Sequence, residues 1–367
     1  MNMSLSEVKK LPLHAEHERF RANFMEFAGW TVPLSYSSIV DEHDAVRKNV
    51  GVFDVSHMGK ILAEGDRASD FLEWVFSNRL SKISCGQAIY GLLLNPEGGI
   101  CDDVIVYKLA PNRYFMIVNA GTRERDWEWL NRNSDGGVRL TDQMDSLNIL
   151  AVQGPKSPDV LSEVFQCDFH HCPSFSCREV VFRNEKILIG ATGYTGERGF
   201  ELFAPVGIST ELFRAIFERG APFSIRPIGF GARDTLRLEV KYLLYGQDMD
   251  TETTPLEAGL EWTCDFSKDF LGKQALLKQK ENGILRKLVS FEIPKGGIAR
   301  HGYEIRRKGE AVGRVTSGTF SPSLKKAIGL GYVPVDLSTI GSEFDVMIRE
   351  RAVKARVVKA PFYRHAV

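Results

Sequence analysis

Hydrophobic and polar positions along the chain follow two periods, which predict a mixture of helices and strands. Residues 38–50 set Ile39, His43 and Val46 on one helical face behind a serine cap, so we expect a helix here that Gly51 ends. The same spacing predicts further helices over 66–78, around Trp127 and Trp129, and over 157–165, 209–220 and 229–244.

Strands are predicted where runs of β-branched and aromatic residues lie between turn residues. Runs over 88–95, 100–109 and 114–119 are separated by PEGG and APNR, which favour antiparallel hairpins. A strand over 146–154 and a strand–turn–strand segment over 186–205 follow. Strands therefore alternate with helices without the strict rhythm of a parallel α/β fold.

The length of 367 residues and a change of pattern near residue 284 predict more than one domain. Beyond that point the segments become short strands with Lys-Gly and Gly-Ser turns, which favour a small β-barrel or sandwich. Lys plus Arg and Asp plus Glu number 47 each, so net charge gives no reason to expect a nucleic acid or a membrane surface as partner. Because the chain lacks a long apolar run and an apolar N-terminal signal segment, we expect a cytoplasmic protein.

Six cysteines, three of them beside two histidines within 167–177, raise the question of a metal site. Zinc sites usually show cysteine pairs two to four residues apart with a second pair further along the chain. That spacing is missing here, so we predict reduced thiols and no bound metal.

The segment GGICDD (98–103) places two adjacent carboxylates at the start of an otherwise apolar strand. Adjacent residues of a strand face opposite sides, so one of Asp102 and Asp103 can point inward while the other meets solvent. An inward carboxylate is costly unless it has a partner, which favours a functional role. A solvated hairpin end, where Asp beside Gly is common, remains the alternative.

The segment GYTGERGFEL (193–202) combines a glycine-rich turn with Glu201, one residue into an apolar strand. A carboxylate there can accept two hydrogen bonds from a guanidine-like edge, and a bond to a core arginine is the alternative. The glycine spacing fits neither a Walker loop nor a dinucleotide fingerprint.

The segment GARDTLRLE (231–239) sets Arg233 and Arg237 four residues apart on one helical face with no acid between them. Arg233 also lies in the first helical turn, an unfavourable place for a cation, so we expect an anion nearby. Pairing with Asp234, Glu239 or a neighbouring strand is the alternative. His57 lies alone in a loop, which is more typical of a structural histidine than of a base.

At these residues the sequence resembles the T-protein (aminomethyltransferase) family of the glycine cleavage system. The matching blocks run in order along nearly the whole chain and include EFAGWTVPLSY (26–36), VGVFDVSHMG (50–59), GGICDD, GYTGERGFELF, GARDTLRLE, YLLYGQDMD (242–250) and PFYR (361–364). Each block alone is modest, whereas the ordered set is highly specific. Cys101 departs from the family, which usually has an aliphatic residue there, and we interpret it as a small hydrophobic side chain.

The resemblance implies an α+β fold of the three-domain clover-leaf type that binds folate, with a small C-terminal β-barrel. Its implied domains are a folate-binding region over 9–283 and a barrel over 284–367. The first region would comprise two interleaved α+β domains, about 9–55 with 143–245 and 56–142 with 246–283. No metal or redox cofactor is implied.

The resemblance also implies a reaction and its site residues. The enzyme would transfer the one-carbon unit from the aminomethyl-lipoyl arm of H-protein to tetrahydrofolate, releasing ammonia. Asp103 matches the essential carboxylate, and Glu201 matches the acid that binds the pterin edge. The remaining matches to the folate site are Tyr194, Arg233, Tyr90, Asn119, Tyr107, Met58, Arg300 and Arg364.

Three other functions remain open from the sequence. A stand-alone folate-dependent demethylase would share the folate site. A folate-binding protein of iron–sulphur cluster maintenance looks to need a K-G-C-Y-x-G-Q-E signature, whereas this chain reads KYLLYGQDM and lacks that cysteine. A non-catalytic folate-binding module would bind folate without turning over a lipoylated partner.

Overall fold

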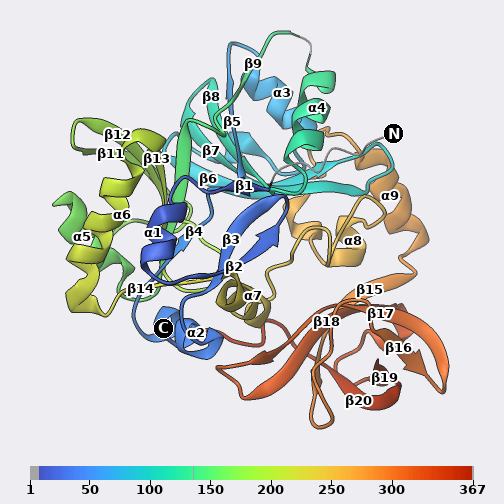
Figure 1. The fold of residues 1–367 in the computed structure, drawn as a ribbon. Helices are drawn as coiled ribbons and strands as arrows, with labels where there is room; N and C mark the ends of the chain where they lie inside the picture. The colour runs from blue at the N-terminus through green and yellow to red at the C-terminus, as the bar shows by residue number, and fades with distance from the viewer. Residues whose placement is uncertain (1–7, 135, 366–367) are drawn as a thin grey trace, which may run out of the picture. The chain divides into compact units, whose positions relative to one another are not determined.

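The computed structural model describes residues 8–134 and 136–365 (Figure 1). The chain forms two compact units that share the sequence in alternating segments. Unit 1 comprises Met1–Ile61 and Asp142–Asp234, and unit 2 comprises Leu62–Thr141 and Thr235–Val367. The three-domain boundaries expected from the family resemblance stay a prediction.

Unit 1 is built on a six-stranded sheet in the order β11-β12-β13-β10-β4-β14. The sheet's strands are β4 (Gly51–Asp54), β10 (Leu147–Gln153), β11 (Cys177–Phe182), β12 (Glu185–Gly190), β13 (Gly199–Pro205) and β14 (Arg226–Pro227). Helices α1 (His14–Arg19), α2 (Ile39–Lys48), α5 (Ser157–Phe165) and α6 (Val206–Gly220) accompany it. The predicted strand–turn–strand segment is confirmed as β12 and β13, which pair antiparallel.

A small three-stranded sheet at the start of unit 1 is not predicted by the sequence pattern. It comprises β1 (Lys9–Lys10), β2 (Asn23–Phe27) and β3 (Trp30–Ser35) in the order β1-β3-β2. The turn between β2 and β3 uses Ala28 and Gly29 at positive φ, and this alanine hides the glycine-type turn from sequence reading.

Helix α2 begins as predicted, because the Ser38 side chain accepts a hydrogen bond from the amide of Asp41. Its end differs from the prediction: the helix stops at Lys48, and Gly51 is the first residue of β4. An added Cβ at Gly51 would lie 2.3 Å from Ile228. The glycine therefore permits close packing of β4 and does not cap the helix.

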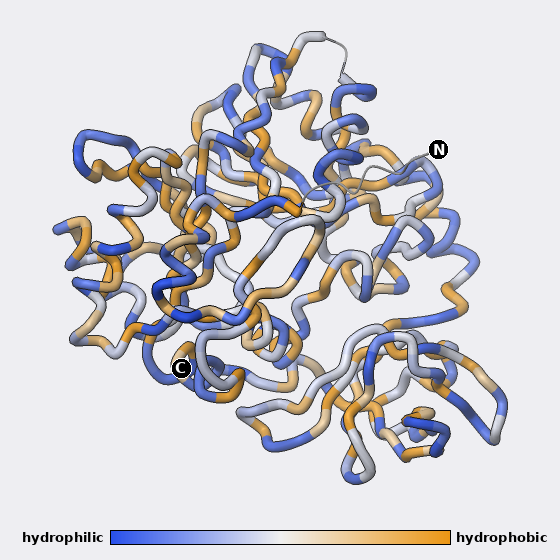
Figure 2. Tube along the Cα trace, viewed as in Figure 1, coloured by the Kyte–Doolittle hydropathy of each residue, from blue (hydrophilic) through white to orange (hydrophobic). Residues whose placement is uncertain are grey.

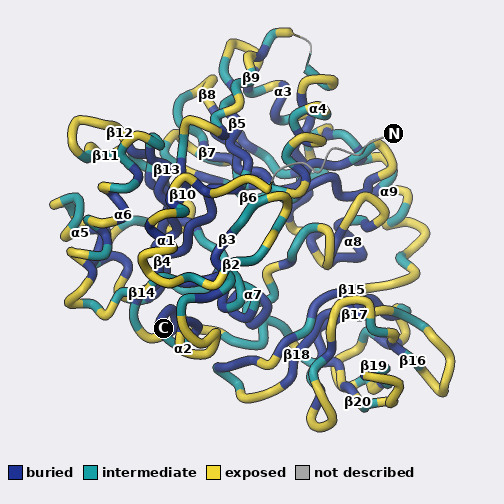
Figure 3. The backbone as a smooth tube through the Cα atoms, viewed as in Figure 1, coloured by how far each residue is buried: buried dark blue, intermediate teal, exposed yellow. Residues whose placement is uncertain are grey.

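Unit 2 contains the predicted antiparallel meander within a five-stranded sheet of order β6-β7-β8-β5-β9. Its strands are β5 (Gly59–Glu64), β6 (Gln87–Leu94), β7 (Ile100–Ala110), β8 (Arg113–Val118) and β9 (Arg139–Asp142). The chain passes from unit 1 to unit 2 after Ile61, the third residue of β5. Helices α3 (Ala68–Val75), α4 (Arg123–Asn133), α8 (Pro255–Ala258) and α9 (Lys273–Asn282) belong to the same unit. Figure 3 shows buried segments along β5, β6 and β7, where the hydrophobic core lies.

The C-terminal strands form a closed barrel, drawn in orange to red in Figure 1, in the order β15-β18-β17-β16-β19-β20. They are β15 (Arg286–Ile293), β16 (Glu304–Arg307), β17 (Glu310–Ser321), β18 (Lys326–Pro334), β19 (Glu343–Ile348) and β20 (Arg351–Val358). Figure 2 shows hydrophobic and hydrophilic residues mixed along this part of the chain, and buried side chains such as Phe291, Val315 and Phe344 form the core of the barrel. The predicted α+β class and the C-terminal barrel are confirmed.

Helix α7 (Phe230–Glu239) is shorter than the predicted 229–244. The amide of Tyr242 bonds back to the carbonyl of Arg237, and Lys241 takes a positive φ of 59°, which ends the helix without a glycine. The apolar residues that follow extend the helical pattern because Leu243 packs into the core of unit 2.

Arg237 also departs from the expectation of a nearby ligand anion. Its guanidinium lies 2.7 Å from Asp248 and 2.8 Å from the Ser317 hydroxyl, and both ionic side chains are buried. The Thr316 hydroxyl donates to the other oxygen of Asp248. This fixed network joins the end of α7 to the barrel strand β17 and leaves Arg237 committed to the fold.

No helix in residues 8–134 or 136–365 is long and apolar enough to cross a membrane.

Asp248→Asn keeps the shape of the side chain but removes the negative charge that lies 2.7 Å from the buried Arg237 guanidinium. We expect the free energy of unfolding to fall by about 3 to 5 kcal/mol in urea titrations. The matched control is Glu304→Gln, which breaks an exposed pair with Arg306 and should change it by less than about 1 kcal/mol. Equal effects of the two variants would contradict the structural role of the buried pair.

Candidate functional site

The GGICDD segment forms the turn that leads into β7. Gly98 has a φ of +85°, a backbone conformation that favours glycine. A Cβ at Gly99 would lie 1.9 Å from the carbonyl oxygen of Thr251, so the close approach of these two segments needs a glycine there. Asp102 and Asp103 then point to opposite faces of β7, as expected for adjacent strand residues. Asp102 is fully buried, whereas Asp103 is only partly buried and keeps an exposed edge.

Asp103 is held by two of the residues that the sequence assigned to the same site. The Tyr90 hydroxyl on β6 donates to one carboxylate oxygen at 3.1 Å, and the Asn119 side chain donates to the other at 2.9 Å. Ile105 pairs with Ile117 across β7 and β8, so continuing that register by two residues puts Asn119 opposite Asp103. The sheet register thus brings Tyr90, Asp103 and Asn119 together.

The exposed ring of Trp262 stacks on Tyr90, with centroids 5.7 Å apart and planes inclined by 25°. Trp262 lies in the short 3-10 helix Glu261–Thr263 of the same unit. A flat aromatic surface therefore continues from the carboxylate towards solvent, which suits stacking of a planar ligand. The sequence around Trp262 gave no signal that this residue belongs to a site.

The electrostatics of Asp103 differ from those of a surface carboxylate. Burial, followed by the negative charge of Asp102, raises the pKa of Asp103 to about 7, although Tyr90 and Asn119 lower it. A cation arriving beside Asp103 would favour its ionised form. The site therefore has a carboxylate whose charge changes near neutral pH.

In unit 1 the side chain of Gln153 fixes the GYTG turn (193–196). The Gln153 side chain donates to the carbonyl of Thr192 and accepts from the Thr195 hydroxyl. An added Cβ at Gly193 would lie 1.9 Å from the Gln153 oxygen, so only glycine fits there. Arg47 also donates to the carbonyl of Thr195.

This turn holds Tyr194 against Arg233, whose guanidinium carbon lies 4.6 Å from the centre of the tyrosine ring. Glu201 is buried on β13 and accepts a hydrogen bond from the Thr192 hydroxyl at 2.6 Å. Met58 follows β4 in a turn and stays partly exposed. Unit 1 thus provides the Arg233–Tyr194 pair and the buried carboxylate of Glu201 with its hydroxyl donor.

His57 is a neutral side chain in this structure, as expected for a structural histidine. Its ring is buried against Phe27 and Phe230, with centroids 5.7 and 5.0 Å away. Burial and the positive charge of Arg233 lower the pKa of His57 to about 3. A histidine with so low a pKa is a poor general base near neutral pH.

The other predicted site residues of unit 2 are Tyr107, Arg300 and Arg364. Tyr107 shares the Asp103 face of β7, but its ring is fully buried and packs near Phe115. Arg300 donates to the carbonyl of Gly318 in the barrel, and Arg364 is exposed near the end of the described chain. The structure leaves their assignment to the site as a prediction.

The cysteine-rich segment shows no arrangement suited to a metal. Among the described residues, no group of three or more His, Cys, Asp or Glu side chains is placed to hold a metal ion. No disulfide joins any of the six cysteines, which all lie in the described part of the chain, and His171 pairs with Asp168 at 2.6 Å.

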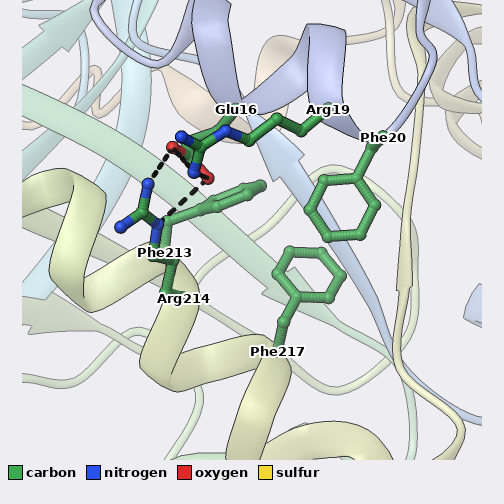
Figure 4. A pocket seen from close by; sticks show the side chains of 6 residues that line it. All are labelled: Glu16, Arg19, Phe20, Phe213, Arg214 and Phe217. Carbon is green, nitrogen blue, oxygen red and sulfur yellow. Dashed lines mark hydrogen bonds and ion pairs between the residues drawn. The ribbon is translucent and has the colours of Figure 1, made fainter.

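A groove of about 260 Å³ in unit 1 contains none of the predicted site residues (Figure 4). Its polar wall is Glu16, which accepts bonds from Arg214 at 2.6 Å and from Arg19 at 3.1 Å. Phe20 and Phe217 form the apolar wall, with ring centroids 4.6 Å apart. Because the Glu16 carboxylate already pairs with two arginines, it is less available to a ligand than the carboxylate of Asp103.

Comparisons with known proteins cover the chain almost from end to end. The family described as the GCVT N-terminal domain matches residues 13–268. The family described as the glycine cleavage T-protein C-terminal barrel domain matches residues 286–364, which is the closed barrel. This chain belongs to the glycine cleavage T-protein family.

Relatives of this T-protein family member share its full length. A protein of Flavobacterium psychrophilum named aminomethyltransferase is 45% identical over 97% of this chain and 100% of its own. Another so named, from Halothermothrix orenii, is 43% identical with the same coverage. The crystal structure of glycine cleavage system aminomethyltransferase T from Bartonella henselae superposes with a TM-score of 0.91, at 32% identity, over 98% of this chain and 99% of that one.

The stability of this T-protein should respond to pH through Asp103. Its pKa is raised from 3.8 to about 7 on folding, so its contribution to stability is full below about pH 4 and is lost as the pH rises through 7. Asp103→Asn has no proton to lose, and its amide keeps both contacts when it accepts from Asn119 and donates to the Tyr90 hydroxyl, which then acts as acceptor. The variant should therefore gain about 2 to 3 kcal/mol over the parent between pH 5 and pH 8, measured by urea unfolding.

The control for this measurement is Asp336→Asn, which changes an exposed carboxylate outside the site. It should shift stability by a similar amount at both pH values. A parent–variant difference for Asp103→Asn that stays constant across the range would contradict the raised pKa.

Proposed function

We propose that this chain is an aminomethyltransferase of the glycine cleavage system that uses tetrahydrofolate as co-substrate. It receives the aminomethyl group on the lipoyl arm of H-protein. The products are 5,10-methylenetetrahydrofolate, ammonia and the dihydrolipoyl form of H-protein. The observation that carries the proposal is the partly exposed carboxylate of Asp103, held by Tyr90 and Asn119 beside a stacking surface.

The role proposed for Asp103 follows from charge. Release of ammonia from an aminomethyl carbon leaves that carbon electron-poor, and a fixed carboxylate favours positive charge at that point. Because Tyr90 and Asn119 fix both carboxylate oxygens, Asp103 needs little reorganisation when the charge develops. Its burial strengthens the interaction relative to water.

The residues of unit 1 suit the recognition of folate. A pterin ring offers a row of N–H donors, and the buried carboxylate of Glu201 can accept two of them. The Tyr194 ring provides a flat surface, and Arg233 above it provides a positive charge for the anionic glutamate tail. Met58, Tyr107, Arg300 and Arg364 are assigned to the folate site on the family resemblance alone.

Relatives named aminomethyltransferase over the full chain length favour this activity over a demethylase or a binding-only module. Tetrahydrofolate, the lipoyl arm, lipoylated H-protein as partner and a cytoplasmic location are parts of the proposal. The decisive assay mixes the protein with tetrahydrofolate and aminomethylated H-protein and measures ammonia. Tight folate binding without ammonia release would favour the binding module.

Asp103→Asn should reduce kcat for ammonia release by about 100-fold or more, because the amide keeps the shape and loses the charge. Folate affinity should change much less, since the amide can still hold the two neighbours. The Asp336→Asn variant serves as the control and should retain full turnover. Turnover of Asp103→Asn close to that of the parent would refute the catalytic role.

Glu201→Gln should weaken tetrahydrofolate binding about 10-fold or more while slowing the saturated enzyme much less. The amide offers one acceptor where the carboxylate offers two, so the loss falls on ground-state binding. Isothermal titration of folate and a separate kcat measurement at saturation distinguish the two effects. An unchanged dissociation constant would exclude Glu201 from the folate site.

A further inference from the structure

Behind Asp103 lies a third buried carboxyl group that the motif analysis does not include. Asp126 belongs to α4, and no part of its surface is exposed. Its partner is Asp102, the fully buried neighbour of Asp103 on β7. Three carboxyl groups thus lie in succession from the interior of unit 2 to its partly exposed edge.

The hydrogen-bond pattern around Asp126 favours a proton on this carboxyl group. Both of its carboxyl oxygens are buried and neither accepts a hydrogen bond at normal distance among the described residues, although the Thr122 hydroxyl is close enough to lower the pKa of Asp126. An ionised carboxylate only accepts hydrogen bonds, so two ionised carboxylates cannot satisfy each other. One proton shared between Asp102 and Asp126 turns the contact into a donor–acceptor bond.

The proton belongs on Asp126. Asp102 accepts hydrogen bonds from the amide of Asn119 at 3.0 Å and from its side chain at 2.9 Å, and both favour the ionised form of Asp102. Burial raises the pKa of Asp102 as well, but these hydrogen bonds oppose the rise, whereas burial and the nearby charge of Asp102 raise the pKa of Asp126 to about 10.

The surrounding groups do not remove the need for this proton. Arg125 is 4.0 Å from Asp126 and directs its guanidinium to the Cys101 carbonyl and the Tyr245 hydroxyl. The other titratable groups packed around the pair are Asp103 and the Cys101 thiol on β7, whose pKa burial raises to about 11.

We propose that Asp126 is a positioning residue whose protonated carboxyl donates to Asp102, so that Asp102 stays ionised and holds Asn119 against Asp103. The Asn119 side chain transmits the effect, because it donates to Asp102 at 2.9 Å and to Asp103 at 2.9 Å. The catalytic consequence rests on the proposed function of Asp103, whereas the arrangement of the pair does not.

Two variants of equal size separate hydrogen bonding from packing. Asp126→Asn keeps a donor for Asp102, whereas Asp126→Leu has a similar shape and no donor. Without a donor Asp102 takes up a proton itself, and its negative charge no longer acts on Asp103. The charge of Asp102 raises the pKa of Asp103 by more than the Asn119 hydrogen bond lowers it. Loss of that charge should therefore lower the pKa of Asp103.

The test measures the titration midpoint of Asp103 by carboxyl carbon NMR, assigned with Asp103→Asn, and ammonia release in the full assay. Asp126→Asn should keep the midpoint and stay within about threefold of the parent turnover. Asp126→Leu should lower the midpoint by about one pH unit or more and turnover by at least about tenfold, with little change in KM for folate. Equal behaviour of the two variants, or an unchanged midpoint in Asp126→Leu, would overturn the proposal.

A second variant covers the case in which Asp126→Leu does not fold. Asp102→Asn removes the same charge from beside Asp103 and should lower its midpoint, and an unchanged midpoint would also overturn the proposal. Failure of the proposed function has a different signature: Asp103→Asn would keep full turnover while Asp126→Leu still shifted the midpoint.

Discussion

Burial of carboxyl groups in the meander of unit 2 is the constraint on which the candidate site depends. Removing a charge from water costs several kcal/mol unless hydrogen bonds or counter-charges offset the loss. Around β7 this cost is offset step by step, through Asp126 on α4, Asp102 on β7 and Asn119 after β8, until Asp103 reaches an exposed edge. The carboxylate that remains at that edge has a pKa near 7 and two fixed neighbours.

Other buried ionic groups in the molecule are compensated differently. In unit 1, burial opposes ionisation of Asp54, yet hydrogen bonds from His17 and Ser56 outweigh it and lower its pKa. In unit 2, Arg237 and Asp248 meet as full charges of opposite sign with further hydroxyl donors. These networks hold elements together, whereas Asp103 is held by the neutral side chains of Tyr90 and Asn119 and so keeps a negative site available for a cation.

Short-range patterns explain how well the sequence predicted the elements. The meander, the strand–turn–strand segment and the barrel follow from period-two runs between turn residues, because such runs bury one face in any context. The element ends were less predictable. Helix α7 stops at Glu239, although the apolar spacing continues, because Lys241 takes a left-handed conformation and Leu243 packs elsewhere in the core.

The sequence by itself determined that Asp102 and Asp103 face opposite sides of a strand, since side chains alternate along β structure. The ordered motifs also determined the family. Only the tertiary structure decided which acid is buried, that Asp126 lies behind the pair, and that Arg237 is bound to Asp248. Burial and pairing join residues far apart in the chain, and pKa values follow from those distances, which no local pattern encodes.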